Sequence, residues 1–412
     1  MSKSLNSIPT LVESPFIIAT IGGVTFGSYS GNKNVDGNLI NVRYPNFMKS
    51  MQIVKVNGTV NTYTLTFSYP VRFGEDPNLL DKIFSKATKD RKITLQYGDW
   101  NAPGDIYKEE VCIITNVTCS LNMSSATIDY TVNCTSDAIG LTSTTFNFVG
   151  KEAKPSDVFM NLLRSKKYGL NTVFTGMRDI ENVLRNNLIT SNDKKVKLLP
   201  QNNVTVLSYM SYLTDCMIND SNSSPTAITN SKYYLTIHDD VRNNVGGTYF
   251  KIDEVSSNTR TINSIDTYEL DVNYPGDNFV TNFSIHNDQS WSILYEFNEE
   301  IKQESYSYYI NDEGKMSTRY MPSNLVNSNG EVSAAKSSWW TQMTQFPIKA
   351  SVTLKGLTRP SILMTYVRLN VLFTGGIKHI SSGLYIITKQ TDTIDSSGYR
   401  TTLELVRVGE DA

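Results

Sequence analysis

The chain has 412 residues, enough for two or three domains that each bury a core. Lys and Arg number 38 against 40 Asp and Glu, and this near balance argues against a nucleic-acid-binding surface, which shows a basic excess. The mean hydropathy is -0.28, and no apolar stretch approaches the roughly 18 to 20 residues that a membrane span needs. We therefore expect no membrane span and no sequence-specific nucleic-acid binding.

The N-terminus and the cysteines favour a protein that is made and kept in a cytoplasm. Residues 1–13 contain Lys3 but no apolar core of signal-peptide length. None of the four cysteines belongs to a C-x-x-C pair or has a histidine at ligand spacing, so we expect buried thiols and no zinc site. These cysteines are Cys112, Cys119, Cys134 and Cys216.

Residues 1–150 have the pattern of a β domain, in which apolar and polar residues alternate along short strands. Asn57-Gly58 predicts a hairpin turn, and residues 31–37 are expected to form a polar loop. Asp76 and Pro77 predict the start of a helix, as the N-cap and the first turn. Its apolar stripe is Leu80, Ile83, Phe84 and Ala87. The predicted strands are 16–18, 24–26, 51–56, 61–69, 93–97, 111–121 and 127–134.

From residue 151 to residue 258 the pattern predicts a smaller α+β insert. Helices are expected where apolar residues recur at helical spacing between Ser, Thr, Asp or Asn boundaries. The first begins at Pro155, and strands follow at 231–237 and 248–252. The apolar stripes are Val158, Phe159, Leu162 and Leu163, then Ile180, Val183, Leu184 and Leu188, then Val206, Leu207, Met210 and Leu213.

Residues 259–412 return to the strand pattern and predict a second β domain, which includes a helix at 331–346 that Pro347 ends. The closing stretch, 347–408, alternates apolar and polar residues between Gly- and Ser-rich corners. The expected fold class is mainly β: two antiparallel barrel or sandwich domains bracket the α+β insert. Further strands are expected at 280–285, 291–297 and 306–310.

One series of residues occurs in both β domains. Ile113-Ile114-Thr115, Thr118 and a Ser124-Ser125 corner precede an alternating strand, and Ile386-Ile387-Thr388, Thr391 and Ser396-Ser397 do the same. The offset is 273 for the tripeptide (386 against 113) and 272 for the serine pair (396 against 124), so one loop is expected to differ by a residue. This ordered series predicts an internal duplication.

Candidate catalytic groups are few. His238-Asp239-Asp240 is interpreted as a solvated strand end, because His286 and His379 belong to other predicted elements. Glu299-Glu300 is interpreted as a solvated face, although glycoside hydrolysis uses two carboxylates about 5 to 10 Å apart. Trp339-Trp340 fits core or interface packing better than ligand stacking. No nucleophile-elbow, zinc-protease or phosphate-loop motif occurs, so we expect no catalytic, cofactor-binding or metal-binding residues.

The C-terminal third contains the series Gln289-Ser290-Trp291-Ser292, Trp339-Trp340, Ala350-Ser351-Val352-Thr353-Leu354, Ser382-Gly383-Leu384-Tyr385-Ile386-Ile387 and Thr401-Thr402-Leu403-Glu404-Leu405. Taken together, this series resembles the baseplate hub proteins of tailed phages and related contractile injection machines. The first β domain, with Tyr44-Pro45-Asn46 and the strand 63–69, is similar to the first tube-like domain of that family. The resemblance implies two tail-tube-like domains per chain around an insert, assembly as a homotrimer, and no enzymatic activity.

The function that this resemblance implies is that of a structural symmetry adapter, which joins a hexameric tail tube to a trimeric central spike. The implied partners are the tail tube or distal tube ring protein, the spike, other baseplate proteins and the tape-measure protein. The implied location is the tail baseplate of a virion, after assembly in the host cytoplasm. Two alternatives stay open: a β-sandwich tail protein that binds host carbohydrate through Trp100 or Trp339-Trp340, and a tail-associated cell-wall hydrolase that uses Asp239 or Glu299.

Overall fold

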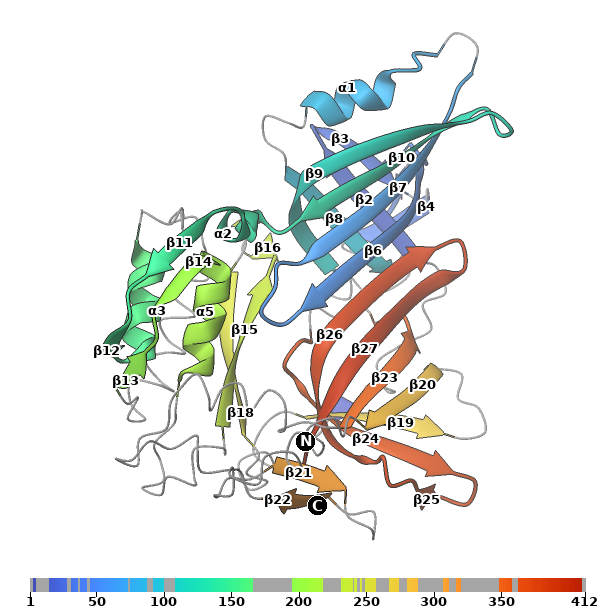
Figure 1. Ribbon diagram of the computed structural model, residues 1–412. Coiled ribbons are helices and arrows are strands. Elements are labelled where there is room, and N and C mark those ends of the chain that lie inside the picture. Colours follow the sequence, from blue (N-terminus) through green and yellow to red (C-terminus); the bar gives the residue numbers. More distant parts are fainter. Residues whose placement is uncertain are drawn as a thin grey trace.

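The computed structural model describes residues 3–4, 15–27, 31–35, 38–42, 45–72, 75–86, 92–99, 108–165, 195–217, 231–239, 241–242, 245–246, 249–256, 267–273, 280–287, 307–310, 316–319, 348–357 and 362–409. The fold is mainly β with an α+β insert, as the sequence predicts. Three clusters of buried apolar side chains define a first β unit, an insert and a second β unit (Figure 1). Among the described strands of the large sheet, no pairing joins the first strand of the order to the last.

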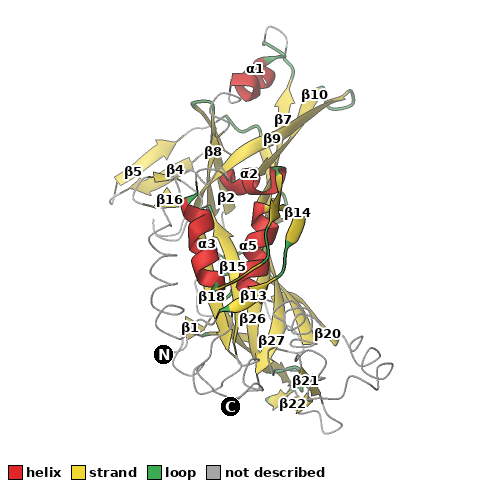
Figure 2. Cartoon of the chain, turned by 60° about the vertical axis from the view of Figure 1, so that its left-hand side comes forward, coloured by secondary structure: helices red, strands yellow, loops and turns green. Residues whose placement is uncertain are grey.

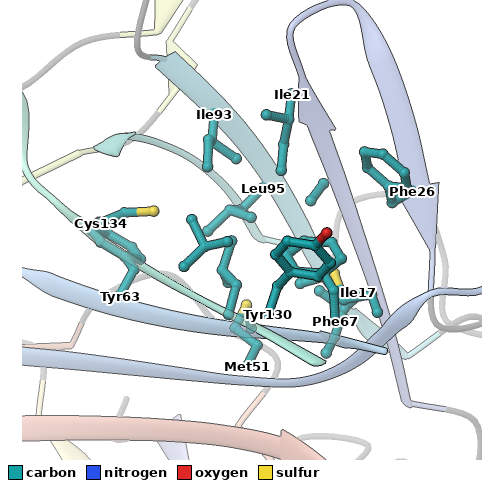
Figure 3. Packing of buried hydrophobic residues seen from close by; sticks show 14 of the residues in the cluster. Ile17, Ile21, Phe26, Met51, Tyr63, Phe67, Ile93, Leu95, Tyr130 and Cys134 are labelled. Atoms are coloured by element: carbon teal, nitrogen blue, oxygen red, sulfur yellow. The ribbon is translucent and has the colours of Figure 1, made fainter. Parts of the chain in front are cut away.

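The first β unit is a strongly bent sheet whose concave side holds the core. In β7 the side chains alternate between buried and half-buried, as the period of a strand requires. Tyr63, Phe67 and Tyr130 point into this core with residues of neighbouring strands (Figure 3). The elements are β2 (Pro15–Ile21), β3 (Val24–Gly27), β4 (Gly31–Val35), β5 (Asn38–Val42), β6 (Met48–Val56), β7 (Thr62–Pro70), α1 (Leu79–Lys86), β8 (Lys92–Asp99), β9 (Lys108–Asn122) and β10 (Thr127–Thr135).

Helix α1 packs against this core by the predicted stripe. The Asp76 carboxylate accepts a hydrogen bond from the backbone N–H of Asn78 (2.9 Å), which is the expected capping contact. Leu80 and Phe84 are buried, and the Phe84 ring meets the rings of Phe67 and Tyr130 edge to face at 5.5 Å. The helix is therefore held to the sheet by aromatic contacts.

The insert packs two helices against a hairpin. Figure 2 shows α3 and α5 standing beside the β15–β18 hairpin, and their apolar residues form the insert core with Leu235, Ile237, Phe250 and Ile252. Its elements are η1 (Asp137–Ile139), α2 (Gly140–Ser143), β11 (Thr145–Phe148), β12 (Lys151–Ala153), α3 (Pro155–Arg164), β13 (Val196–Leu198), β14 (Gln201–Thr205), α5 (Val206–Asp215), β15 (Ser231–His238), β16 (Val241–Arg242), β17 (Val245–Gly246) and β18 (Tyr249–Ser256).

The second β unit repeats the architecture of the first. Its core is made of alternating residues from the closing strands, with Leu270 and Val272 from β19. The N-terminal strand β1 adds to its edge by pairing with β19 in parallel. The elements are β1 (Lys3–Ser4), β19 (Tyr268–Asn273), β20 (Val280–Asn287), β23 (Ile348–Lys355), β24 (Tyr366–Phe373), β25 (Ile377–Lys378), β26 (Gly383–Asp395) and β27 (Gly398–Gly409), and β21 (Ser307–Ile310) pairs separately with β22 (Met316–Arg319).

The two β units share one connectivity. Hydrogen-bonded neighbours follow the order β6-β7-β10-β9-β8-β2 in the first and β20-β23-β27-β26-β24-β19 in the second. This order matches each strand of the first unit with one strand of the second. The matched strands also occur in the same sequence order along the chain. One pairing differs, because β2 is antiparallel to β8 whereas β19 is parallel to β24. The predicted internal duplication is therefore present in the topology.

Two irregularities of the backbone are duplicated as well. In β9 the ladder to β10 skips Thr115, and in β26 the ladder to β27 skips Thr388, the last residue of the same Ile-Ile-Thr tripeptide. In β6 the ladder to β7 skips Lys49, and in β20 the ladder to β23 skips Thr281. Because a β-bulge fixes the register on both sides of it, these positions align the two units residue by residue.

The alignment corrects the predicted loop difference. The last paired residues of the two hairpins are Asn122 with Thr127, and Asp395 with Gly398. Four residues therefore form the turn in the first unit and two in the second, so the loops differ by two residues and not by one. The serine pairs have different places in the two turns, which is why they gave an offset of 272.

Several other expectations have definite outcomes. Residues 31–35 of the predicted polar loop 31–37 form β4 and pair with β5, because backbone pairing needs no apolar side chains. The expectations at 180–188, 291–297 and 331–346 fall outside the described residues. Among the helices that the structure describes, none has the length and apolar character to cross a bilayer.

Candidate functional site

The two β units meet along one strand, β26, which divides one of its edges between two neighbours. Residues Gly383–Ile386 pair with β24 of the same unit, and Lys389–Ile394 pair antiparallel with β6 of the first unit. Figure 1 shows the β26–β27 hairpin lying against β6. One continuous sheet therefore passes through both units.

The side chains beneath this junction are buried. Ile394 faces Met51, and both belong to the core of the first unit together with Tyr399 of β27. The Tyr399 ring meets the ring of Tyr97 edge to face, with the centroids 6.4 Å apart. The second unit thus completes the core of the first, rather than resting on its surface.

A buried ion pair lies under the junction in the first unit. Lys55 of β6 and Glu110 of β9 are 1% and 2% exposed, and the ammonium group contacts the carboxylate directly. The hydroxyl groups of Tyr63 and Tyr97 also donate to this carboxylate, at 2.9 and 2.6 Å. Removing two charges from water is costly, and these added hydrogen bonds offset part of that cost.

A second buried carboxylate ties the insert to the first unit. Asp239 is 1% exposed and accepts hydrogen bonds from Ser136 (2.6 Å), Asn61 (2.7 Å) and Tyr63 (3.0 Å). Its backbone carbonyl accepts the N–H of Val111 at 2.9 Å. Since the single hydroxyl hydrogen of Tyr63 is shared between Asp239 and Glu110, the two carboxylates belong to one network.

The interpretation of His238-Asp239-Asp240 as a solvated strand end is wrong for the first two residues. His238 is buried, and its Nε2 lies 3.2 Å from the hydroxyl of Thr236. Strand β15 ends against β9, as the bond from Val111 to Asp239 shows, so the end of the strand is covered. The Asp239 carboxylate is therefore enclosed and hydrogen-bonded.

A third carboxylate, Asp392, lies on β26 beside the junction. It accepts hydrogen bonds from Thr401 (2.7 Å), Gln390 (2.9 Å) and Tyr399 (3.0 Å). Gln390 stands opposite Lys55 in the ladder between the units. The polar groups of both units therefore converge where the sheet crosses from one unit to the other.

Electrostatics keep the tyrosines of this junction protonated. Burial, followed by the charge of Asp239, raises the pKa of Tyr63 well above its ordinary value. Burial and the nearby Glu110 raise the pKa of Tyr97, and burial and Asp392 raise the pKa of Tyr399. The three hydroxyls therefore act as fixed hydrogen-bond donors. Within the described part of the chain, no group of three or more His, Cys, Asp or Glu residues is arranged to hold a metal ion.

Sequence reasoning missed Lys55, Glu110 and Asp392 as members of a cluster. A signal existed, because Lys55 falls in phase with the apolar residues Met51 and Ile53 of its strand. A charged residue on the buried face of a strand indicates a buried partner. Of the candidates named from the sequence, Trp100, Glu299 and Trp339-Trp340 lie outside the described residues.

One cysteine also departs from expectation. Cys112, Cys134 and Cys216 are buried, as predicted, but Cys119 is exposed. It lies in the second half of β9, where no described strand pairs with the edge that faces away from β10. The matching half of β26 is covered by β6.

Comparison with known proteins gives matches of structure only. No protein-family model matches the chain, and no curated protein matches it by sequence. A tail protein from Neisseria meningitidis is similar in structure at 9% identity and a TM-score of 0.49, over 96% of this chain and 97% of that one. The 43 kDa tail protein of a Shewanella oneidensis prophage is similar at 11% identity and a TM-score of 0.47, over 96% and 97%. An E. coli component of the type VI secretion system is similar at 10% identity and a TM-score of 0.43, over 94% and 76%.

The fold thus defines the chain as a duplicated β protein in which two equivalent units and an insert meet at a buried polar junction. The structures similar to it are two tail proteins and a secretion-system component.

Proposed function

We propose that the chain is a structural baseplate hub of a phage tail, which joins a hexameric tail tube to a trimeric central spike. The observation that carries the proposal is the duplication: two units with the same strand order, the same chain order and the same two bulges lie in one continuous sheet. Three copies of such a chain present six equivalent units. A trimer can then match six-fold symmetry on one side and three-fold symmetry on the other.

The junction supports a role that depends on fixed geometry. A hub holds its two tube-like units in one relative orientation, and here a β ladder, a shared core and a network of buried polar groups all connect them. Buried hydrogen bonds are directional, so they favour one arrangement over others that an apolar contact alone would allow. The sequence predicts the division 1–150, 151–258 and 259–412, and we propose it with the first boundary moved to residue 137, because Ala138, Leu141 and Phe148 belong to the insert core.

The proposed partners are a second and a third copy of this chain, the tube or distal tube ring protein, the central spike, other baseplate proteins and the tape-measure protein. The proposed location is the baseplate of the virion. A role without catalysis fits the junction, whose carboxylates Glu110, Asp239 and Asp392 are buried and hydrogen-bonded.

The test is the mass of the assembly. Native mass spectrometry of the purified chain, alone and with its spike partner, is expected to show a species of about 139 kDa, three times the 46.2 kDa of one chain. A chain that stays monomeric in both samples contradicts the proposal. Imaging of particles that carry a label on this protein is expected to place the label at the tail tip.

A further inference from the structure

The pairing of β26 with β6 inside the chain is a template for a contact between chains. β26 corresponds to β9, and β6 corresponds to β20, by strand order and by the bulges at Thr388 and Thr115 and at Lys49 and Thr281. Within the chain, the edge of β26 is covered by β6. The corresponding edges of β9 and β20 have no described partner strand, because β9 pairs with β8 only up to Ile113 and β20 pairs only with β23.

We propose that the second half of β9 in one copy pairs antiparallel with β20 of the next copy, as β26 pairs with β6 inside the chain. The bulges fix the register. Ile394 opposite Met51 becomes Leu121 opposite Phe283, and Asp392 opposite Ile53 becomes Cys119 opposite Ile285. The occupant of each open edge is therefore a second copy of this chain, and this deepens the proposed function by assigning the surface that builds the trimer.

The exposed apolar residues on β9 and β20 support a second copy of the chain as the partner of these edges. Ile394 is 3% exposed, whereas Leu121, at the equivalent position in β9, is 71% exposed. Ile53 is fully buried, whereas Ile285, at the equivalent position in β20, is 40% exposed. The two edges thus carry large apolar side chains at the positions that the junction inside the chain buries.

The composition of the two edges points the same way. Sheet edges that stay solvated are protected from pairing by lysine, proline or other charged residues. The stretch Asn116–Asn122 of β9 contains neither a Lys, Arg, Asp or Glu residue nor a proline, and β20 (Val280–Asn287) contains none either. Among the residues that the structure describes, both edges are therefore open to strand addition.

The two edges belong to different units, so the contact joins unlike surfaces of two copies. Such a head-to-tail contact generates either a closed ring or an open filament, according to the rotation between copies. A ring that closes after three copies contains six units, in which first and second units alternate. Closure after three copies rests on the proposed function, whereas the pairing of the edges does not.

Disulfide trapping tests the register directly. Residues directly opposite each other in an antiparallel pair have Cα atoms about 4.5 to 5.5 Å apart, within the range that a disulfide bridges. The variant Ile285→Cys, in the full chain with its native Cys119, is expected to form covalent dimers and trimers under mild oxidation, seen on non-reducing gels. The matched controls are Ser284→Cys, whose side chain lies on the other face of β20, and Ile285→Cys combined with Cys119→Ser. Both controls are expected to cross-link at least about tenfold less.

A second variant needs no cysteine chemistry. Leu121→Lys places a charge in the proposed contact while changing a residue that is exposed in the single chain. It is expected to raise the concentration needed for half-assembly by about tenfold or more, measured by mass photometry. The matched control is Ile377→Lys, which changes another exposed apolar residue on β25, away from both edges.

The outcomes separate the two proposals. A trimer that tolerates Leu121→Lys, and whose Ile285→Cys variant forms no cross-link to Cys119, overturns this edge pairing and leaves the hub function in place. Cross-linked chains longer than three copies support the pairing and overturn closure at three. A chain that is monomeric and uncross-linked under every condition overturns both.

Discussion

The two β units have the same connectivity but different surroundings, and the difference is concentrated at equivalent positions. The edge of β26 is covered by β6, and the same edge of β9 is open among the described residues. Ile394 is therefore a core residue while its equivalent, Leu121, faces solvent. Burial at this position depends on the neighbouring unit and not on the fold of the unit that carries it.

The polar residues differ in the same way. Lys55 of β6 forms a buried ion pair with Glu110, whereas the equivalent position of β20 holds Asn287. Asp392 and Tyr399 form a hydrogen bond in the second unit, whereas Cys119 and Ile128 occupy the equivalent positions in the first. The duplicated scaffold thus retains its strand order while the junction receives its own polar groups.

The largest expected effect comes from breaking the ion pair that has no counterpart in the second unit. Glu110→Ala removes the carboxylate that contacts the buried Lys55 ammonium and that accepts hydrogen bonds from Tyr63 and Tyr97. We expect a loss of about 3 to 5 kcal/mol in the free energy of unfolding, measured by urea denaturation. A loss below about 1 kcal/mol contradicts the assignment of this pair to the buried network.

The control for that variant removes both charges. Lys55→Met combined with Glu110→Leu keeps the two side-chain volumes similar and removes both buried charges together. It is expected to be more stable than Glu110→Ala alone, because a buried ion pair replaced as a whole by apolar groups often costs little.

The next largest loss of stability is expected at Ile394, in contrast to its equivalent position, Leu121. Ile394→Ala opens a cavity in a packed core and is expected to cost about 2 to 5 kcal/mol. Leu121→Ala changes an exposed residue and is expected to alter the unfolding of the single chain by at most about 0.5 kcal/mol. Urea denaturation at protein concentrations below assembly measures both. Equal losses would show that the two positions do not differ in burial.

A smaller effect is expected from Tyr399→Phe. The Tyr399 hydroxyl lies 2.9 Å from the carbonyl of Leu357 and 3.0 Å from the carboxylate of Asp392, so its removal leaves buried acceptors with fewer donors. The expected loss is about 1 to 3 kcal/mol, measured by thermal and urea unfolding. Ile128→Leu, at the equivalent position of the first unit, is the control and is expected to cost less than about 1.5 kcal/mol.

The smallest effect concerns pH and the two turns. Hydrogen bonds from Ser397 lower the pKa of Asp395, whereas the equivalent residue, Asn122, makes its turn contacts without a charge. A carboxylate whose pKa is lower in the folded state stabilises the protein above its unfolded pKa of about 3.9, and this stabilisation is lost as the pH falls through the folded pKa.

Asp395→Asn is therefore expected to cost about 0.5 kcal/mol or less at pH 7, because the group is partly solvated, and less still at pH 3. Thermal unfolding of the wild type and the variant at both pH values measures the difference between them. A difference that grows as the pH falls would contradict the sign of the pKa shift.

Much of this fold follows from local patterns. Alternation located the strands of both units, Asn57-Gly58 located the β6–β7 turn, and the tripeptide at 113–115 and 386–388 identified the duplication. These features depend on residues that are near one another in the sequence.

The junction could not be predicted in this way. The pairing of β26 with β6 joins strands that are far apart in the sequence, and the residues of neither strand indicate which strand it pairs with. For the same reason Asp239 had the pattern of a solvated strand end, although β9 covers it. Lys55 carried a usable signal, because its phase along β6 placed a charge among buried residues.

The ladder between β26 and β6 also sets how the chain responds to mechanical load. Six consecutive residue pairs, from Lys389 with Val56 to Ile394 with Met51, connect the two units. Because ladder hydrogen bonds run perpendicular to the strands, a force that slides one unit along the other loads all of them together, whereas a force that peels the hairpin away breaks them one after another. The protein is therefore expected to resist sliding along the strand direction more strongly than peeling across it.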